Sequence, residues 1–75
     1  MSKKFVLKEL RRLPGVGKSL SNDLYDIGIR SISDLCGKHP QRLYEKLCQV
    51  KPHRKHPCVL YIFRCAVYFA SAKTL

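Results

Sequence analysis

A glycine-rich stretch of this chain has the residue types that could bind an anion. Residues 13–19 read Leu-Pro-Gly-Val-Gly-Lys-Ser. The two glycines permit a tight reversal with a positive φ, and they leave no side chain in the way of a ligand. The first N–H groups of a helix that follows the turn lack partners inside it, and the helix dipole adds partial positive charge there. The pattern therefore predicts an anion site, because phosphate groups fit helix N-termini.

Basic and hydroxyl side chains flank the predicted turn. Lys18 would add a full positive charge and Ser19 a hydroxyl group, while Arg11 and Arg12 stand before the turn. Groups of this kind fix a protein on a nucleic-acid backbone and carry no information about base sequence. The predicted contact residues are Arg11, Arg12, Gly15, Val16, Gly17, Lys18 and Ser19.

The charge balance supports a polyanionic partner. The 75 residues include 15 lysines and arginines against five acidic residues, a formal net charge of +10. These bases are spread along the chain, which favours a basic folded surface over a disordered arm. Nucleic acid is the favoured partner, ahead of an anionic membrane, an acidic protein or a role in solubility alone. Lys51, Arg54 and Lys55 form a second candidate patch. The bases expected only to be solvated are Lys3, Lys4 and Lys73.

Two helices should hold the turn. The spacing of apolar residues predicts the first over residues 6–13, and Pro14 disfavours its continuation. The second is predicted over residues 18–26, with Gly28 as its C-terminal cap. Both helices would keep an apolar face inward and a polar face outward.

The rest of the chain also reads as helical. A short helix is expected through Leu35 and Cys36, and a longer one starts near Pro40, a residue that suits a first helical turn. Residues 51–57 have two prolines and no apolar residue, which is typical of a loop. The apolar segment 58–73 is expected to be a buried helix that closes the core.

The residues around the turn resemble the helix-hairpin-helix motif of DNA repair and recombination proteins. Apolar positions on both sides of the turn complete the match. Most of residues 7–70 is also similar to the pathogenicity-locus family of small bacterial helix-hairpin-helix proteins. The stretches that carry this second resemblance are 13–19, 23–24 with 28–29, 33–35, 43–48 and 57–64.

The resemblance implies a site and a partner. Helix-hairpin-helix proteins bind a DNA phosphate with hairpin amides, which here would be those of Gly15 and Gly17, with Lys18 and Ser19 in support. They often hold a monovalent cation at hairpin carbonyls, and the matching carbonyls are those of Arg11, Leu13 and Val16. The resemblance is also the reason to expect DNA rather than RNA. The chain departs from the family at Pro57. In the family an acidic residue often precedes the cysteine that corresponds to Cys58, so any function of that acidic side chain is missing here.

These observations predict one all-α domain over residues 1–75. The expected architecture has five helices, an N-terminal helix-hairpin-helix and a degenerate second hairpin unit within residues 29–47, an arrangement described as SAM-like. A domain of this size has a modest core. The predicted function is sequence-nonspecific DNA binding through hairpin amides. The main alternative is a protein-interaction module, for docking or homodimerisation, that uses the apolar C-terminal helix.

An enzyme is a weaker interpretation. In helix-hairpin-helix DNA glycosylases a catalytic lysine, when present, lies two positions after the second hairpin glycine, and Ser19 occupies that position here. A glycosylase must also extrude a base into a pocket, for which so short a chain has little room. No catalytic residue is therefore assigned.

Cysteine and histidine residues of the second half could suggest zinc. Their spacing matches no known zinc finger, so the expected roles are core packing and solvation, and no metal site is assigned. The residues concerned are Cys48, His53, His56, Cys58 and Cys65. No signal peptide or membrane span is expected, so the predicted location is the cytoplasm, with the cysteines as free thiols.

Overall fold

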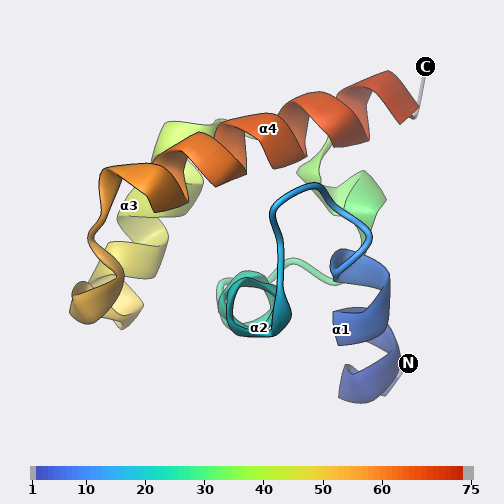
Figure 1. Ribbon diagram of the computed structural model, residues 1–75, viewed down its shortest axis with the longest axis horizontal. Helices are drawn as coiled ribbons and strands as arrows, with labels where there is room; N and C mark the ends of the chain where they lie inside the picture. The colour runs from blue at the N-terminus through green and yellow to red at the C-terminus, as the bar shows by residue number, and fades with distance from the viewer. Residues whose placement is uncertain (1, 74–75) are drawn as a thin grey trace.

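A computed structural model describes residues 2–73 of the chain. The side chain of Lys73, expected to be solvated, lies outside the described residues. Within residues 2–73 the chain forms α-helices and short 3-10 helices and no strand (Figure 1). The elements are α1 (Lys3–Leu10), α2 (Lys18–Asp26), η1 (Ile32–Leu35), α3 (Pro40–Val50), η2 (Pro52–Arg54) and α4 (Pro57–Lys73). The all-α prediction is confirmed for this part of the chain.

The prediction of five helices is not confirmed, because the short helix expected before Gly37 is the 3-10 helix η1. The described residues contain four α-helices. In η1 the Asp34 N–H donates to the Ser31 carbonyl at 3.2 Å, across three residues. Such bonds are typical of runs of three or four residues. Gly37 follows with φ 78° and turns the chain before an α-helix can form.

Helix α1 begins and ends three residues earlier than the predicted segment 6–13. The Ser2 hydroxyl caps it by accepting a hydrogen bond from the Phe5 N–H at 3.3 Å. At the other end, the Leu13 N–H donates to the Leu10 carbonyl at 3.1 Å, which tightens the chain as it leaves the helix. Helix α2 matches its predicted bounds.

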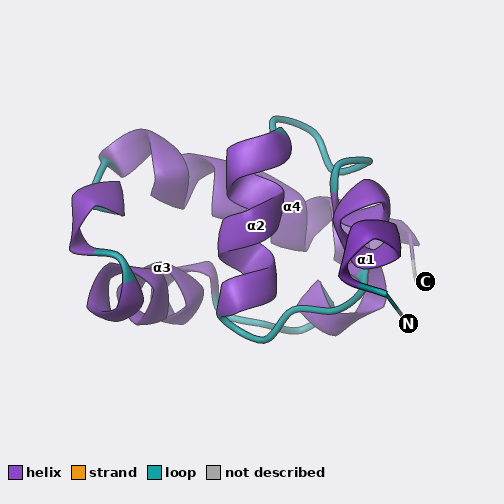
Figure 2. Cartoon of the chain, turned by 90° about the horizontal axis from the view of Figure 1, so that it is seen from below, coloured by secondary structure: helices purple, strands orange, loops and turns teal. Residues whose placement is uncertain are grey.

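Helix α4 crosses the molecule and covers the other elements from one side (Figures 1 and 2). Helix α3 packs along α4, while α1 and α2 pack on each other beneath it. The inner face of α4 contributes Phe63, Ala66 and Ala70 to the core, as predicted. The fully buried leucines that belong to the same core cluster come from the other elements and are Leu10, Leu24, Leu35 and Leu47.

Two turns of the chain share one backbone geometry. Gly15 has φ 77° and Gly37 has φ 78°. In each turn, the residue after the glycine donates its N–H to the carbonyl two residues before the glycine: Val16 to Leu13 at 3.2 Å, and Lys38 to Leu35 at 3.0 Å. A helix begins three residues after each glycine, at Lys18 and at Pro40. The turn within residues 29–47, where a degenerate second hairpin unit is predicted, therefore has the same backbone geometry as the first turn.

Candidate nucleic-acid interface

Two apolar side chains anchor the turn between α1 and α2 from the inside. Leu13 and Val16 are buried in the core, whereas Pro14 and Gly15 are exposed. The positive φ of Gly15 is a conformation that residues with side chains rarely adopt. The Val16 N–H is engaged inside the turn, so Val16 holds the turn in place and has no amide to offer a ligand.

The backbone donors at the start of α2 have no hydrogen-bond partner within residues 2–73. Gly17 is the N-cap and gives no side-chain cap, and the first helical bond joins the Ser21 N–H to the Gly17 carbonyl at 2.9 Å. The N–H groups of Gly17, Lys18 and Ser19 are therefore unpaired, and all three residues are exposed. A Cβ on Gly17 would meet no atom within 4 Å. Open amides at the positive end of a helix are suited to an anion.

A shallow groove between α1 and α2 is lined by basic side chains. Lys3, Lys4 and Arg11 contribute from the N-terminal segment, and Lys18 contributes from the first turn of α2. The other lining residues are Leu7, Ser21 and Asn22. Arg11 and Lys18 were predicted as site residues, and the structure places them on one groove.

The sequence interpretation did not assign Lys3 and Lys4 to the site. Apolar periodicity starts at Val6, so both lysines were expected to lie before the helix and only in solvent. The Ser2 cap starts α1 earlier and makes both lysines part of its first turn. The Lys3 ammonium also lies 5.2 Å from the ring centroid of Tyr25 on α2. The sequence feature that could have predicted the earlier start of α1 is Ser2, because serine is a favoured N-cap residue.

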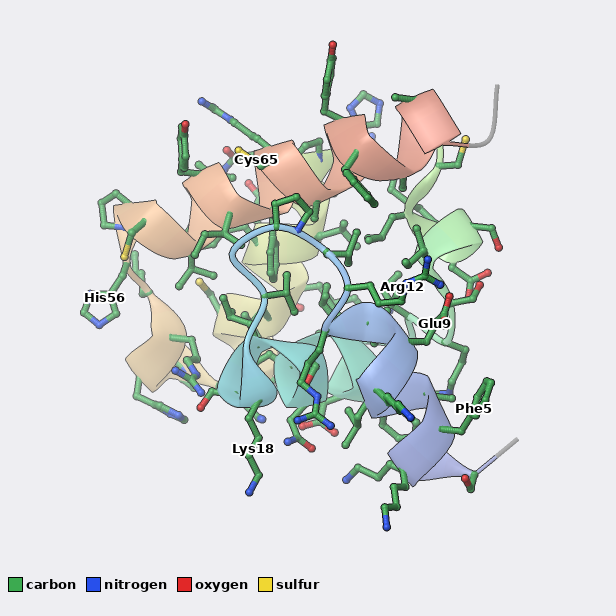
Figure 3. The ribbon with its side chains drawn as sticks, turned by 45° about the vertical axis from the view of Figure 1, so that its right-hand side comes forward. Phe5, Glu9, Arg12, Lys18, His56 and Cys65 are labelled. Carbon is green, nitrogen blue, oxygen red and sulfur yellow. The ribbon has the colours of Figure 1, made fainter. Side chains whose placement is uncertain are left out.

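Arg12 lies apart from this groove. Its Nη1 is 3.2 Å from Glu9 Oε1, and Figure 3 shows the two side chains directed toward each other, while Lys18 projects from α2. Arg12 lines a neighbouring hollow with Phe5, Lys8, Glu9 and Arg11. Arg11 therefore borders both hollows, and the acidic partner of Arg12 offsets part of its charge.

The second candidate patch of the sequence analysis is wrong for two of its three bases. Lys51 Nζ lies 2.9 Å from Asp23 Oδ1 and 2.7 Å from Asp26 Oδ2, and Arg54 Nε lies 2.9 Å from Asp23 Oδ2. Asp23 is fully buried, and a buried carboxylate requires nearby positive charge. Lys51, the N-cap of η2, and Arg54, its last residue, therefore hold η2 against α2 through ion pairs. Lys55 is the one base of that patch that is exposed.

The ion pairs shift the titration of their partners. A hydrogen bond from Lys51 is the main cause that lowers the pKa of Asp26 below its ordinary value. Hydrogen bonds to Asp26 and then to Asp23 raise the pKa of Lys51. Both shifts favour the charged forms of the pair at neutral pH, which is consistent with a role of these groups in holding η2 against α2.

All five acidic residues form ion pairs or accept hydrogen bonds, whereas most of the described bases have no acidic partner. Glu9, Asp23 and Asp26 form the ion pairs described above. Asp34 accepts a hydrogen bond from the Arg30 N–H at 3.0 Å, and Glu45 accepts one from Gln41 at 3.3 Å. The bases without an acidic partner in the described part of the chain are Lys3, Lys4, Lys8, Arg11, Lys18, Arg30, Lys38, Arg42, Lys46, Lys55 and Arg64. The exposed surface is therefore strongly basic.

A family model described as Cdd1, pathogenicity locus, matches residues 3–75. The chain belongs to this family. The family part of the predicted resemblance is thereby confirmed. No curated protein and no solved structure matched the chain. The description of the pathogenicity-locus family specifies neither a ligand nor a reaction.

The cysteine and histidine side chains of this pathogenicity-locus chain are dispersed, and its helices are short or polar. Among residues 2–73, no three cysteine, histidine or acidic side chains come together as metal ligands would. Cys48 and Cys65 are half-buried, whereas Cys58, His53 and His56 are exposed. No helix in the described range has both the length and the apolar character needed to cross a bilayer.

Proposed function

We propose that this protein binds DNA through the sugar-phosphate backbone, without reading base sequence. The observation that carries the proposal is the uncapped start of α2, where the unpaired amides of Gly17, Lys18 and Ser19 adjoin a groove lined by basic side chains. A phosphate there would accept hydrogen bonds from the amides and gain from the helix dipole. Lys18 and Arg11 would add charge, and none of these groups distinguishes one base from another.

The turn would act as a helix-hairpin-helix. Its buried Leu13 and Val16, its positive-φ Gly15 and the helices on either side are the features that the motif requires. The matching geometry at Gly37 supports a degenerate second hairpin. Pro40 is the first residue of the helix after that turn and lacks an N–H. The second turn therefore offers fewer donors, and the first is the principal site.

A monovalent cation could also bind at carbonyl oxygens of the same turn. The resemblance implies the carbonyls of Arg11, Leu13 and Val16 as its ligands. The Leu13 carbonyl already accepts the Val16 N–H at 3.2 Å, and its second lone pair would serve the cation. Such an ion would add positive charge near the phosphate and would strengthen DNA binding.

We also infer that the protein is not an enzyme and acts inside the cytoplasm. Ser19 stands where a glycosylase would carry its lysine. The hollows beside the turn are open to solvent and bordered by basic side chains, which suits a nucleic-acid backbone.

The test is fluorescence anisotropy of a labelled blunt duplex at several salt concentrations. Gly17→Ser would supply a hydroxyl that caps an amide of α2 and competes with the phosphate. Lys18→Gln removes one charge beside the amides, and Lys55→Gln is its charge-matched control on a different hollow. We expect Lys18→Gln to raise Kd roughly tenfold and to reduce the salt slope by about 1.

The proposal requires Gly17→Ser and Lys18→Gln to weaken binding while Lys55→Gln changes it little. Equal effects of Lys18→Gln and Lys55→Gln would mean that diffuse charge binds DNA and that the turn is structural. Absence of duplex binding near physiological salt would overturn the proposal altogether.

A further inference from the structure

The outer face of α4 carries two exposed tyrosines. Tyr61 is 67% exposed and Tyr68 is 78% exposed, although the opposite face of the same helix supplies the core. They are seven residues apart, so they share one side of the helix, separated by about 10.5 Å along its axis. Their rings contribute little to packing, and their shared face suggests a role in binding.

Positive charge accompanies these rings. Arg64 is exposed, lies between the two tyrosines in sequence and has no acidic partner within the described residues. The sequence of α4 contains no aspartate or glutamate. We call Tyr61, Arg64 and Tyr68 the tyrosine face. It presents flat apolar rings beside positive charge, which complements a ligand with flat rings and negative charge.

The tyrosine face adjoins the hairpin turn. A shallow, almost wholly apolar groove is lined by Pro14 of the turn together with Arg64 and Tyr68 of α4. The remaining lining residues are Cys65, Phe69 and Ala72. The Ile62 side chain lies so close to Gly15 that a Cβ there would be 3.5 Å from it. A strand bound at the turn could therefore continue onto α4.

We propose that the tyrosine face stacks unpaired bases of a DNA strand whose backbone is held at the hairpin turn. This proposal rests on the proposed function and specifies its substrate class, which is duplex DNA that continues into a single strand. Exposed aromatic rings interleaved with arginine bind single strands in this way, because every base has a face to stack. The spacing of the tyrosines matches about three nucleotide steps of 3.4 Å.

The expected effect is large enough to measure. Stacking of one base on an aromatic side chain strengthens binding roughly five- to 150-fold. The hydroxyl of Tyr68 is not required for stacking, so Tyr68→Phe should retain the effect and Tyr68→Leu should lose it. The exposure of Tyr68 means that neither change should disturb the core. Circular dichroism would verify the helical content of each variant.

The experiment compares three labelled probes by fluorescence anisotropy. One is a blunt duplex, the second has a single-stranded extension of four thymidines, and the third has an extension of four abasic sites, which keeps the phosphates and lacks the bases. We expect the thymidine extension to bind at least five times more tightly than the other two. Tyr68→Leu and Tyr61→Leu should each reduce this preference without changing affinity for the blunt duplex.

The outcomes separate this inference from the proposed function. If the blunt duplex binds and the thymidine extension adds no more than the abasic one, the inference fails while the proposed function stands. If the leucine variants leave the preference intact but abolish a concentration-dependent dimer seen by sedimentation, the face is a protein contact and the inference is wrong. If none of the probes binds, both proposals fail.

Discussion

At the residue scale, the two glycines of the turn differ in their backbone conformation and therefore in their roles. Gly15 adopts φ 77°, and a side chain there would be strained whatever space surrounds it. Gly17 has φ −97° and ψ −162°, an extended conformation that any residue can adopt, and open space lies beside it. Gly15 therefore shapes the turn, whereas Gly17 keeps its outer surface clear for a ligand.

This difference predicts changes of stability with opposite signs. Gly15→Ala should lower the free energy of unfolding by about 1–2 kcal/mol, the cost of a left-handed conformation with a Cβ. Gly17→Ser should raise it by roughly a few tenths of a kcal/mol, because serine is a slightly better N-cap. Urea unfolding monitored by circular dichroism measures both. A loss of stability in Gly17→Ser would contradict the assigned cap geometry.

The buried carboxylate of Asp23 gives the second prediction at this scale. Lys51→Met leaves Asp23 with only Arg54 and leaves Asp26 without its ion pair, so the free energy of unfolding should fall by about 1–3 kcal/mol. Lys55→Met, a change of the same type at an exposed residue, should alter it by no more than about 0.5 kcal/mol. Equal effects of the two substitutions would show that the ion pairs do not stabilise the fold.

The pH dependence of this effect has a definite sign. The pKa of Asp26 is lowered in the folded protein, so its contribution is present above its unfolded pKa, near 3.8, and is lost as the pH falls through the folded value. The raised pKa of Lys51 leaves its contribution intact below 10.5 and removes it only as the pH rises through the folded value. The stability difference between native protein and Lys51→Met should therefore shrink below about pH 4.

At the scale of elements, local signals predicted some helices and not others. The bounds of α2 followed from residues at its own ends, because Lys18 comes directly after the glycines and Gly28 caps the far end. The shift of α1 came from Ser2, a cap that apolar periodicity does not register. The interpretation of Lys51, Arg54 and Lys55 as a basic patch failed for the first two, because Lys51 and Arg54 pair with Asp23, 28 positions from Lys51 in sequence. Local spacing carries no information about such a partner.

Helix α4 combines a buried face with an exposed one, and substitutions on the two faces should behave differently. Phe63 is almost fully buried, so Phe63→Ala should lower the free energy of unfolding by about 3–5 kcal/mol, which is enough to unfold much of a small domain. Tyr61→Ala on the exposed face should change it by about 0.5 kcal/mol or less. Thermal unfolding of the two variants checks this. A large loss from Tyr61→Ala would place that ring in the fold and not at a surface.

At the scale of the whole molecule, the distribution of charge is the feature on which the proposed function depends. The acidic residues form ion pairs or accept hydrogen bonds. Of the bases without an acidic partner in the described residues, Lys3, Lys4, Arg11 and Lys18 line the groove between α1 and α2, and Arg64 lines the groove between α4 and Pro14. Composition alone predicted a basic surface. Only the fold could show which bases are neutralised, such as Arg54, and which ones meet at one groove, such as Lys3 and Lys18.

The most direct test of the central claim is an NMR titration of the 15N-labelled protein with a short DNA duplex. The chemical shifts of amides that bind a phosphate change strongly. Those of amides that are only near non-specifically bound DNA change weakly and by similar amounts. We predict the largest shifts at Gly17, Lys18 and Ser19, and their loss in Gly17→Ser. Shifts concentrated around Lys55, or spread evenly over all exposed lysines, would contradict phosphate binding at the start of α2.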